Sequence, residues 1–248
     1  MSYRKDIDLE FLQYCTNEEL KNLFEVLTID PKDNLERITS TLKMSNEHKM
    51  YGEDYHKYWE RIAEELQLFG GNTIVNIFRK GTGVLYREIV LDVAKHIKAS
   101  INKNDIIENI EDAIATKLTL DLLEKMSEEQ IKEFFEEMDD QEIKQILAEY
   151  KDVPWRVSSP FIVDKIFKIG KFTSYKMTLR IVNLIWKNLF GREVSFIAKR
   201  SGIIVGEYLF LGLAGPILIE LAGPAKRITV PAVLLISCLR KEVKLRKC

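Results

Sequence analysis

The 248-residue sequence contains little glycine and proline, 12 and 6 residues respectively. An all-β chain of this length needs many tight turns, and glycine and proline are the residues that usually form them. Leucine, isoleucine, lysine and glutamate are abundant instead, which favours helices. With 46% hydrophobic and 30% charged residues, the composition is neither that of a disordered tail nor that of an integral membrane bundle. We therefore expect a folded, all-α protein.

Cysteine is also scarce, because only Cys15, Cys238 and Cys248 occur. An odd number of cysteines without Cys-x-x-Cys spacing indicates neither a disulfide framework nor a zinc knuckle. Free thiols suit a reducing compartment. No apolar segment typical of a secretory signal follows the basic residues of the opening MSYRKDIDLE. We expect a cytoplasmic protein.

Motifs for catalysis and cofactor binding are missing as well. The three histidines form no His-Glu-x-x-His pattern, and no cysteine lies in a recognisable nucleophile setting. Gly81-Thr82-Gly83 lacks the third glycine of a dinucleotide-binding fingerprint, since Tyr86 stands at that position, and there is no Walker lysine. The prediction is a protein that is not an enzyme and uses neither a metal nor a cofactor.

The charge is distributed unevenly along the chain, although its net value is only −1. From Lys151 onward there are 18 Lys or Arg and 6 Asp or Glu, a net charge of +12, which leaves 19 basic and 32 acidic residues, or −13, in residues 1–150. Such an asymmetry indicates either a partner of opposite charge for each half or docking of the two halves onto each other. The sequence leaves both alternatives open.

Capping boxes and apolar spacing predict the helices of the first half. Thr16 and Glu19 form a capping box ahead of a helix over 17–28, and Ser127 and Gln130 form a second one. Apolar residues at helical spacing predict further helices ending at Gly70-Gly71 and near residue 97, and three more between about 103 and 150. We expect a bundle of about ten or more short helices.

A change of composition divides the sequence into two regions. Pro154, Ser158, Ser159 and Pro160 are poor helix formers, and the charge changes sign near them. The predicted organisation is an acidic helical region, 1–152, a linker, 153–160, and a basic, apolar helical region, 161–248. One continuous domain is the alternative.

The basic region begins with a narrow stripe of cations. Lys165, Lys176, Arg180 and Lys187 fall within about 60° of one another at 100° per residue, and we call these four residues the basic stripe. We predict that it faces an anionic membrane surface or an acidic protein partner, with docking onto the acidic half as the alternative. Nucleic acid is not expected, because the aromatic residues of this region are spaced like a core and no nucleic-acid-binding signature occurs. These aromatic residues are Phe161, Phe167, Phe172, Tyr175 and Trp186.

Two charge-free runs, 208–219 and 228–239, follow the stripe. Each is shorter than the 18 or so residues that span a bilayer, so we predict buried core helices. The second run has a β-rich composition, but Pro231 argues against a central strand. The alternative is a hairpin about Gly215-Pro216 and Gly223-Pro224 that inserts into a membrane on a trigger, against which Glu207 and Glu220 argue.

A polar cluster surrounds the glycines at the end of the expected helix near residue 70. It comprises Gly70, Gly71, Asn72, Arg79, Gly81, Arg87 and Asp92. We expect a structural role, in which Arg79 or Arg87 pairs with Asp92 and the glycines supply positive φ angles. In the functional alternative, the two arginines grip a carboxylate or phosphate, either as a small-anion site or in an enzyme.

Three segments of the chain resemble one known family. LQLFGGNTIVNIFRKGTGVLYREIVLDVAK, DLEFLQYCTNEELKNL and RITVPAVLLISCLR, which together extend from Asp8 to Arg240, are similar to the bacterial YaaW family of uncharacterised proteins. The matching positions are Gly70, Gly71, Asn72, Arg79, Gly81, Tyr86, Asp92, Thr229 and Pro231. The resemblance assigns no catalytic role. A link between this family and the ubiquinol-cytochrome c chaperones would imply an assembly factor at a membrane, although the tryptophan- and histidine-containing segment of those chaperones is not found here.

The function predicted from the sequence is that of a non-enzymatic helical interaction protein. Its basic, apolar second half would approach the inner face of a membrane or an acidic partner, as a peripheral assembly or chaperone-like factor does. The membrane-inserting hairpin and a site at the glycine loops are the alternatives.

Overall fold

The computed structural model describes residues 3–30, 35–37, 40–70, 83–138, 140–191, 194 and 226–247. Within these ranges the chain forms ten α-helices, two short 3₁₀ helices and, in place of a sheet, a single isolated bridge between Ile29 and Glu36. The helices are η1 (Glu10–Tyr14), α1 (Asn17–Thr28), α2 (Asn46–Tyr51), η2 (Tyr55–Tyr58), α3 (Trp59–Gly70), α4 (Tyr86–His96), α5 (Ile107–Leu123), α6 (Glu128–Glu136), α7 (Gln141–Glu149), α8 (Trp155–Ile169), α9 (Lys171–Phe190) and α12 (Lys226–Lys247). The all-α prediction is confirmed.

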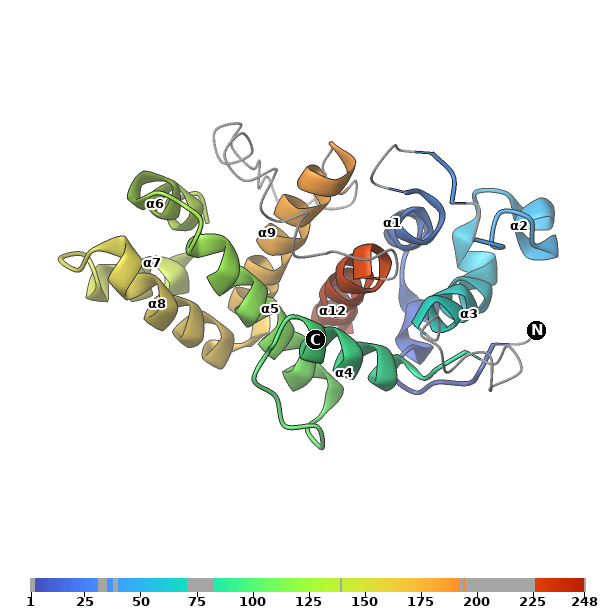
Figure 1. Ribbon diagram of the computed structural model, residues 1–248, viewed down its shortest axis with the longest axis horizontal. Coiled ribbons are helices and arrows are strands. Elements are labelled where there is room, and N and C mark those ends of the chain that lie inside the picture. Colours follow the sequence, from blue (N-terminus) through green and yellow to red (C-terminus); the bar gives the residue numbers. More distant parts are fainter. Residues whose placement is uncertain are drawn as a thin grey trace.

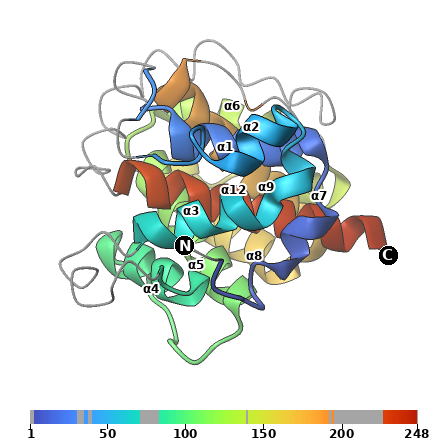
Figure 2. The same ribbon diagram turned by 90° about the vertical axis from the view of Figure 1, so that its right-hand side faces the viewer.

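The other helices are arranged around α12. In Figure 1 this helix lies in the middle of the molecule, with α1 and α3 on one side, α5 and α9 on the other, and α4 below it. Figure 2 shows it crossing the molecule from one face to the other. It contacts η1, α1, α3, α4, α5 and α9, so elements from both halves of the sequence pack against it. The helices α6, α7 and α8 lie beyond α5 and α9, at the end of the molecule opposite α2 (Figure 1).

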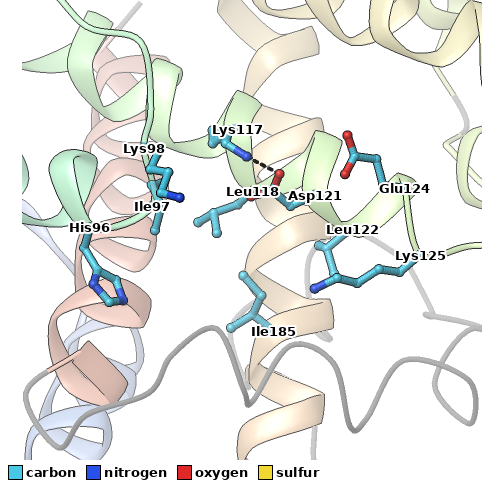
Figure 3. A pocket seen from close by; sticks show the side chains of 10 residues that line it. All are labelled: His96, Ile97, Lys98, Lys117, Leu118, Asp121, Leu122, Glu124, Lys125 and Ile185. Carbon is cyan, nitrogen blue, oxygen red and sulfur yellow. Dashed lines mark hydrogen bonds and ion pairs between the residues drawn. The ribbon is translucent and has the colours of Figure 1, made fainter.

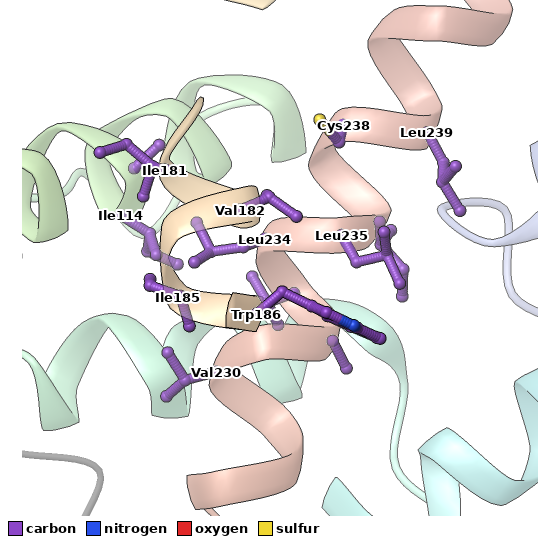
Figure 4. Packing of buried hydrophobic residues seen from close by; sticks show 14 of the residues in the cluster. Ile114, Ile181, Val182, Ile185, Trp186, Val230, Leu234, Leu235, Cys238 and Leu239 are labelled. Carbon is purple, nitrogen blue, oxygen red and sulfur yellow. The ribbon is translucent and has the colours of Figure 1, made fainter. Parts of the chain in front are cut away.

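Residues 228–240 of α12 are buried without exception, which is expected of a helix that is apolar all round. Leu234 and Leu235 pack near Ile185 and Trp186 of α9 (Figure 4). The run 228–239 is therefore a buried core helix, as its shortness predicted. The run 208–219 and the Gly215-Pro216 and Gly223-Pro224 hairpin lie outside the described residues. No helix in the described ranges is both long and apolar enough to cross a bilayer.

The local start signals of the first half act as predicted. The hydroxyl of Thr16 accepts a hydrogen bond from the amide of Glu19, and the Glu19 carboxylate accepts one from the amide of Thr16. Ser127 and Gln130 exchange the equivalent pair of hydrogen bonds at the start of α6. These bonds satisfy amide groups that the first helical turn leaves without partners. α1 begins at Asn17 and ends at Thr28, as the sequence predicts.

The segment predicted as a linker, 153–160, is helical from Trp155 onward, so this part of the prediction is wrong. α8 contains Pro160 as its sixth residue. Ser158 and Ser159 are buried there, and the Ser158 hydroxyl donates to the carbonyl oxygen of Pro154 at 3.2 Å. Burial of this face, which continues with apolar residues further along α8, outweighs the cost of about 3 kcal/mol that a proline inside a helix imposes.

Candidate interaction surface

Two lysines of the basic stripe lie against carboxylates of the first half of the chain. Lys165 of α8 forms an ion pair with Glu149 at the end of α7, and its ammonium group lies 5.4 Å from the ring centroid of Tyr150. Lys176 of α9 lies 3.1 Å from Asp140, whose carboxylate also accepts hydrogen bonds from the first amides of α7. These cations therefore fix α7 onto α8 and α9.

Arg180 of the basic stripe is buried, with 1% of its side chain exposed. It forms an ion pair with Glu137, and its guanidinium group lies 5.0 Å from the ring centroid of Phe134. Burial lowers the pKa of Arg180, against the opposite effect of Glu137. The side chain does not lie on an exposed face, in contrast to the prediction, because α6 and the loop after it cover this part of α9. Lys187, near the end of α9, is half-buried.

The cations of α12 continue the same pattern. Its ion pairs with the first half are Lys226–Asp92, Arg240–Glu111, Lys241–Asp112, Lys244–Glu108 and Arg246–Glu19. Together with the three pairs of the basic stripe, eight ion pairs within the described ranges join residues before Lys151 to residues after it. In this part of the chain, the opposite charges of the two halves meet inside one molecule.

The most buried of these pairs lies at the centre of the fold. Arg240 Nε is 3.1 Å from Glu111 Oε2, and Arg240 Nη2 donates to Glu111 Oε1 at 3.1 Å. Tyr86 of α4 donates its hydroxyl proton to the same Glu111 oxygen at 2.8 Å. Arg240 Nη2 also donates to the carbonyl oxygen of Asp8 at 2.7 Å, and the guanidinium lies 4.5 Å from the ring centroid of Phe11. The network ties α4, α5, α12 and the N-terminal segment together.

The protonation of this network follows from its burial. Burial raises the pKa of the Glu111 carboxyl, while the neighbouring Arg240 charge opposes the rise. Burial and the Glu111 charge both raise the pKa of Tyr86 well above its ordinary value. Tyr86 therefore stays protonated and donates its hydrogen bond to Glu111, so this contact stabilises the fold.

The polar cluster at the glycines is partly within the described residues. Gly70 is the last residue of α3 and its φ is not positive, and Gly71, the other glycine of the predicted left-handed cap, lies outside the described residues. A Cβ atom on Gly70 would lie 2.3 Å from Ile89 Cγ1, and one on Gly83 would lie 2.6 Å from Gln67 Cβ. Close approach of α3 to the segment before α4 and to α4 itself therefore requires these glycines. The predicted residues Gly71, Asn72, Arg79 and Gly81 lie outside the described ranges.

The other two members of the cluster, Arg87 and Asp92, do not pair with each other. Arg87 donates to the carbonyl oxygens of Lys103 and Asp105, at 3.2 and 2.9 Å, and Asp92 forms its ion pair with Lys226. The predicted Arg87–Asp92 pair is wrong because residues five apart on a helix point in different directions. Both side chains instead hold neighbouring segments against α4.

Four exposed apolar side chains are spread along α8 and the start of α9. Val157, Phe161, Ile169 and Phe172 have exposed fractions of 57%, 58%, 41% and 48%, and we call these four residues the α8 surface. Sequence reasoning missed it, because Phe161 and Phe172 share the helical spacing of core residues with Tyr175 and Trp186, which are indeed buried. Residues 151–172, which include the α8 surface, carry five cations and two carboxylates.

The fold and these contacts define an all-α protein whose central helix joins an acidic and a basic half. A family model described as a domain of unknown function, DUF3944, matches residues 3–38. A UPF0174 protein of Helicobacter pylori strain J99 is 36% identical over 98% of this chain and 94% of its own length. The UPF0174 protein YaaW of Escherichia coli K12 is 32% identical over 98% of this chain and 97% of its own.

The chain therefore belongs to the UPF0174 family and is similar to YaaW over nearly its whole length. A UPF0174 protein of Helicobacter pylori strain 26695 is 36% identical over 82% of this chain. No solved structure matches the chain. Of the positions that the family resemblance had indicated, Tyr86 lies in the central network, and Thr229 and Pro231 are buried in α12.

Proposed function

We propose that this protein is a non-enzymatic interaction protein that docks on an anionic membrane surface through the α8 surface. The observation that carries the proposal is the exposure of Val157, Phe161, Ile169 and Phe172 next to exposed cations. Helices that lie in a membrane interface combine such apolar side chains with basic residues. Holding a partner at the membrane, as an assembly or chaperone-like factor does, is the role that such docking would serve.

The contact differs from the one that the sequence suggested, because most of the basic stripe is engaged inside the molecule. The exposed cations of α8 are Lys168 and Arg156, whose guanidinium group also donates to the carbonyl oxygens of Glu124 and Met126. Lys168 shares an ion pair of 2.7 Å with Asp164, in which both side chains are largely exposed, so this pair is screened by water and weak. A cation near an anionic lipid surface contributes about 1 kcal/mol, and full burial of a large apolar side chain contributes about 1.5–3 kcal/mol.

The test is co-sedimentation of the purified full chain with vesicles. We expect binding to phosphatidylglycerol vesicles at low salt, weaker binding at high salt because exposed charges are screened, and little binding to phosphatidylcholine vesicles. The double variant Phe161→Gln/Phe172→Gln should reduce binding at least tenfold with an unchanged circular dichroism spectrum.

The matched control is Met44→Gln/Met50→Gln. These methionines are 65% and 73% exposed, and Met50 belongs to α2, at the opposite end of the molecule (Figure 1). The control variant should bind vesicles as the unchanged protein does. Failure of the unchanged protein to sediment with either kind of vesicle would overturn the proposal. Equal losses in both double variants would do the same, because they would indicate unspecific hydrophobic adsorption.

A further inference from the structure

A cavity of about 350 Å³ lies between the end of α4, the second half of α5 and α9. Its apolar lining comprises Ile97, Leu118, Leu122 and Ile185, and the side chains of Lys98, Lys117 and Lys125 also line it (Figure 3). At about 30 Å³ for each water-sized group, the volume fits roughly a dozen non-hydrogen atoms. Ligand sites commonly combine apolar walls with a few polar groups in this way.

Lys98 has a left-handed backbone conformation, which suits glycine or asparagine better than lysine. Its φ of 58° is the one positive φ among the described residues other than glycine. The amide of Ala99 donates to the carbonyl oxygen of Ala94 at 2.9 Å, so Lys98 stands at the position in this helix ending where glycine is usual. Left-handed backbone costs a residue with a side chain about 1–2 kcal/mol. A lysine is therefore held at the mouth of the cavity at some cost in stability.

The charges that face the cavity favour an anion. Besides the three lysines, the groups at its rim are His96 at the end of α4 and the carboxylates of Asp121 and Glu124 on and after α5. Lys117 forms an ion pair with Asp121, as Figure 3 shows. Lys98, by contrast, takes part in no ion pair among the described residues, so its ammonium group is available to an anion.

We propose that this cavity binds an amphiphilic anion, namely a carboxylate or phosphate group attached to a short apolar body. The apolar body would lie against Leu118, Leu122 and Ile185, and the anionic group would lie against Lys98, whose ammonium can reach the mouth. The required chemistry is shared by free short-chain carboxylates and by the phosphate groups of lipids. The site is independent of the α8 surface.

The probe is octanoate, whose roughly ten non-hydrogen atoms fit the cavity volume by the same estimate. Titration of the full chain, followed by calorimetry and by amide chemical shifts, should show saturable binding with shifts at the ends of α4 and α5. Octanol should bind at least tenfold more weakly, because it lacks the charge. Equal binding of octanol and octanoate, or no saturable binding of octanoate, would overturn the proposal.

Two variants isolate the Lys98 charge from the fold. Lys98→Gly and Lys98→Asn both suit a positive φ, so the melting temperature should hold or rise, while octanoate affinity should fall at least fivefold. The control is Lys95→Ala, since Lys95 belongs to the same helix end but lines a different surface depression beside Asp92; its octanoate affinity should not change. Unchanged affinity in both Lys98 variants would overturn the role of Lys98 and with it the proposal.

Further arms separate the source of the ligand and the two proposed surfaces. If a lipid phosphate is the natural occupant, phosphatidylglycerol vesicles should compete with octanoate. If the natural occupant is a free carboxylate, the vesicles should leave octanoate binding unchanged. The Phe161→Gln/Phe172→Gln variant should bind octanoate like the unchanged protein. Loss of octanoate binding in that variant would contradict an independent site.

Discussion

Arg240 of α12 lies against Glu111 of α5, with 3.1 Å between Arg240 Nε and Glu111 Oε2, although 129 positions separate the two residues in the chain. Their side chains are 7% and 1% exposed. A buried ion pair of this kind owes its value to the presence of both partners, since either charge alone would be left without compensation.

Removal of Arg240 alone should therefore be costly. We expect Arg240→Met to lower the free energy of unfolding by about 3–5 kcal/mol, measured by urea denaturation at pH 7. Adding Glu111→Gln should recover most of the loss, because the amide oxygen still accepts the Tyr86 hydrogen bond without a buried charge. Lys244→Met is the control: its pair with Glu108 is more exposed, so the loss should stay below about 1 kcal/mol. Equal losses for Arg240→Met and Lys244→Met would contradict the central role of this pair.

The loss of stability in Arg240→Met should depend on pH. Burial raises the pKa of the Glu111 carboxyl, and removal of Arg240 takes away the largest charge that opposes that rise. A raised pKa in the folded state means that protonation favours folding, so the contribution is fully present below the unfolded pKa of about 4.3 and is lost as the pH rises. The stability deficit of Arg240→Met relative to the unchanged protein should hence shrink between pH 7 and pH 5. A deficit that is constant over this range would contradict a buried carboxylate as its cause.

The basic stripe gives a prediction about stability and binding together. Arg180→Gln should lower the free energy of unfolding by about 1–3 kcal/mol, because the Glu137 carboxylate loses a charged partner in a buried setting. Lys165→Gln should change the free energy of unfolding much less, since its pair with Glu149 is exposed. Vesicle binding should not change in either variant. An Arg180→Gln protein that is fully stable but no longer binds vesicles would restore the basic stripe as the membrane contact.

At two glycines, substitution by asparagine should differ from substitution by alanine in opposite directions: asparagine should cost less stability than alanine at Gly191 and more at Gly83. Gly191 has a φ of 67° with nothing near its would-be Cβ atom, so Gly191→Ala should cost about 1 kcal/mol and Gly191→Asn less, because asparagine tolerates this conformation. A Cβ atom on Gly83 would lie 2.9 Å from the backbone carbon of Gln67. Gly83→Ala should cost about 1–3 kcal/mol, and Gly83→Asn more, because space is the limit there. Thermal unfolding measures all four changes.

Burial also predicts the reactivity of the cysteines. Burial raises the pKa of the Cys15 and Cys238 thiols, and the thiolate is the reactive form. In a Cys248→Ser variant, neither remaining thiol should react with a disulfide reagent at pH 8 until urea unfolds the protein. Rapid reaction of either thiol in the folded protein would show that its helix opens locally.

Local signals were sufficient for most helices of the first half. Thr16 and Ser127 predict the starts of α1 and α6, because a capping box involves residues only three apart. The same reliance on neighbours misplaced the linker: Pro160 and the serines before it are poor helix formers by themselves, and their burial against other helices cannot be read from adjacent residues.

The candidate surface was harder to predict, because a helical wheel shows which residues share a direction but not what covers them. Arg180 was assigned to an exposed face for this reason, although Glu137 and Phe134 cover it. Phe161 was assigned to the core, although it is exposed. The opposite charges of the two halves did indicate docking as one of two alternatives, but no local pattern could match Arg240 to Glu111.

The central position of α12 has a consequence for the order of events during synthesis. α12 leaves the ribosome after every other described element, and its Arg240 bonds to Asp8, 232 positions earlier. Until it emerges, α1, α3, α4, α5 and α9 lack the surface against which they pack, and their apolar faces stay available to other molecules. Folding of both halves must wait for this helix, so the nascent chain depends on protection from aggregation until α12 has emerged.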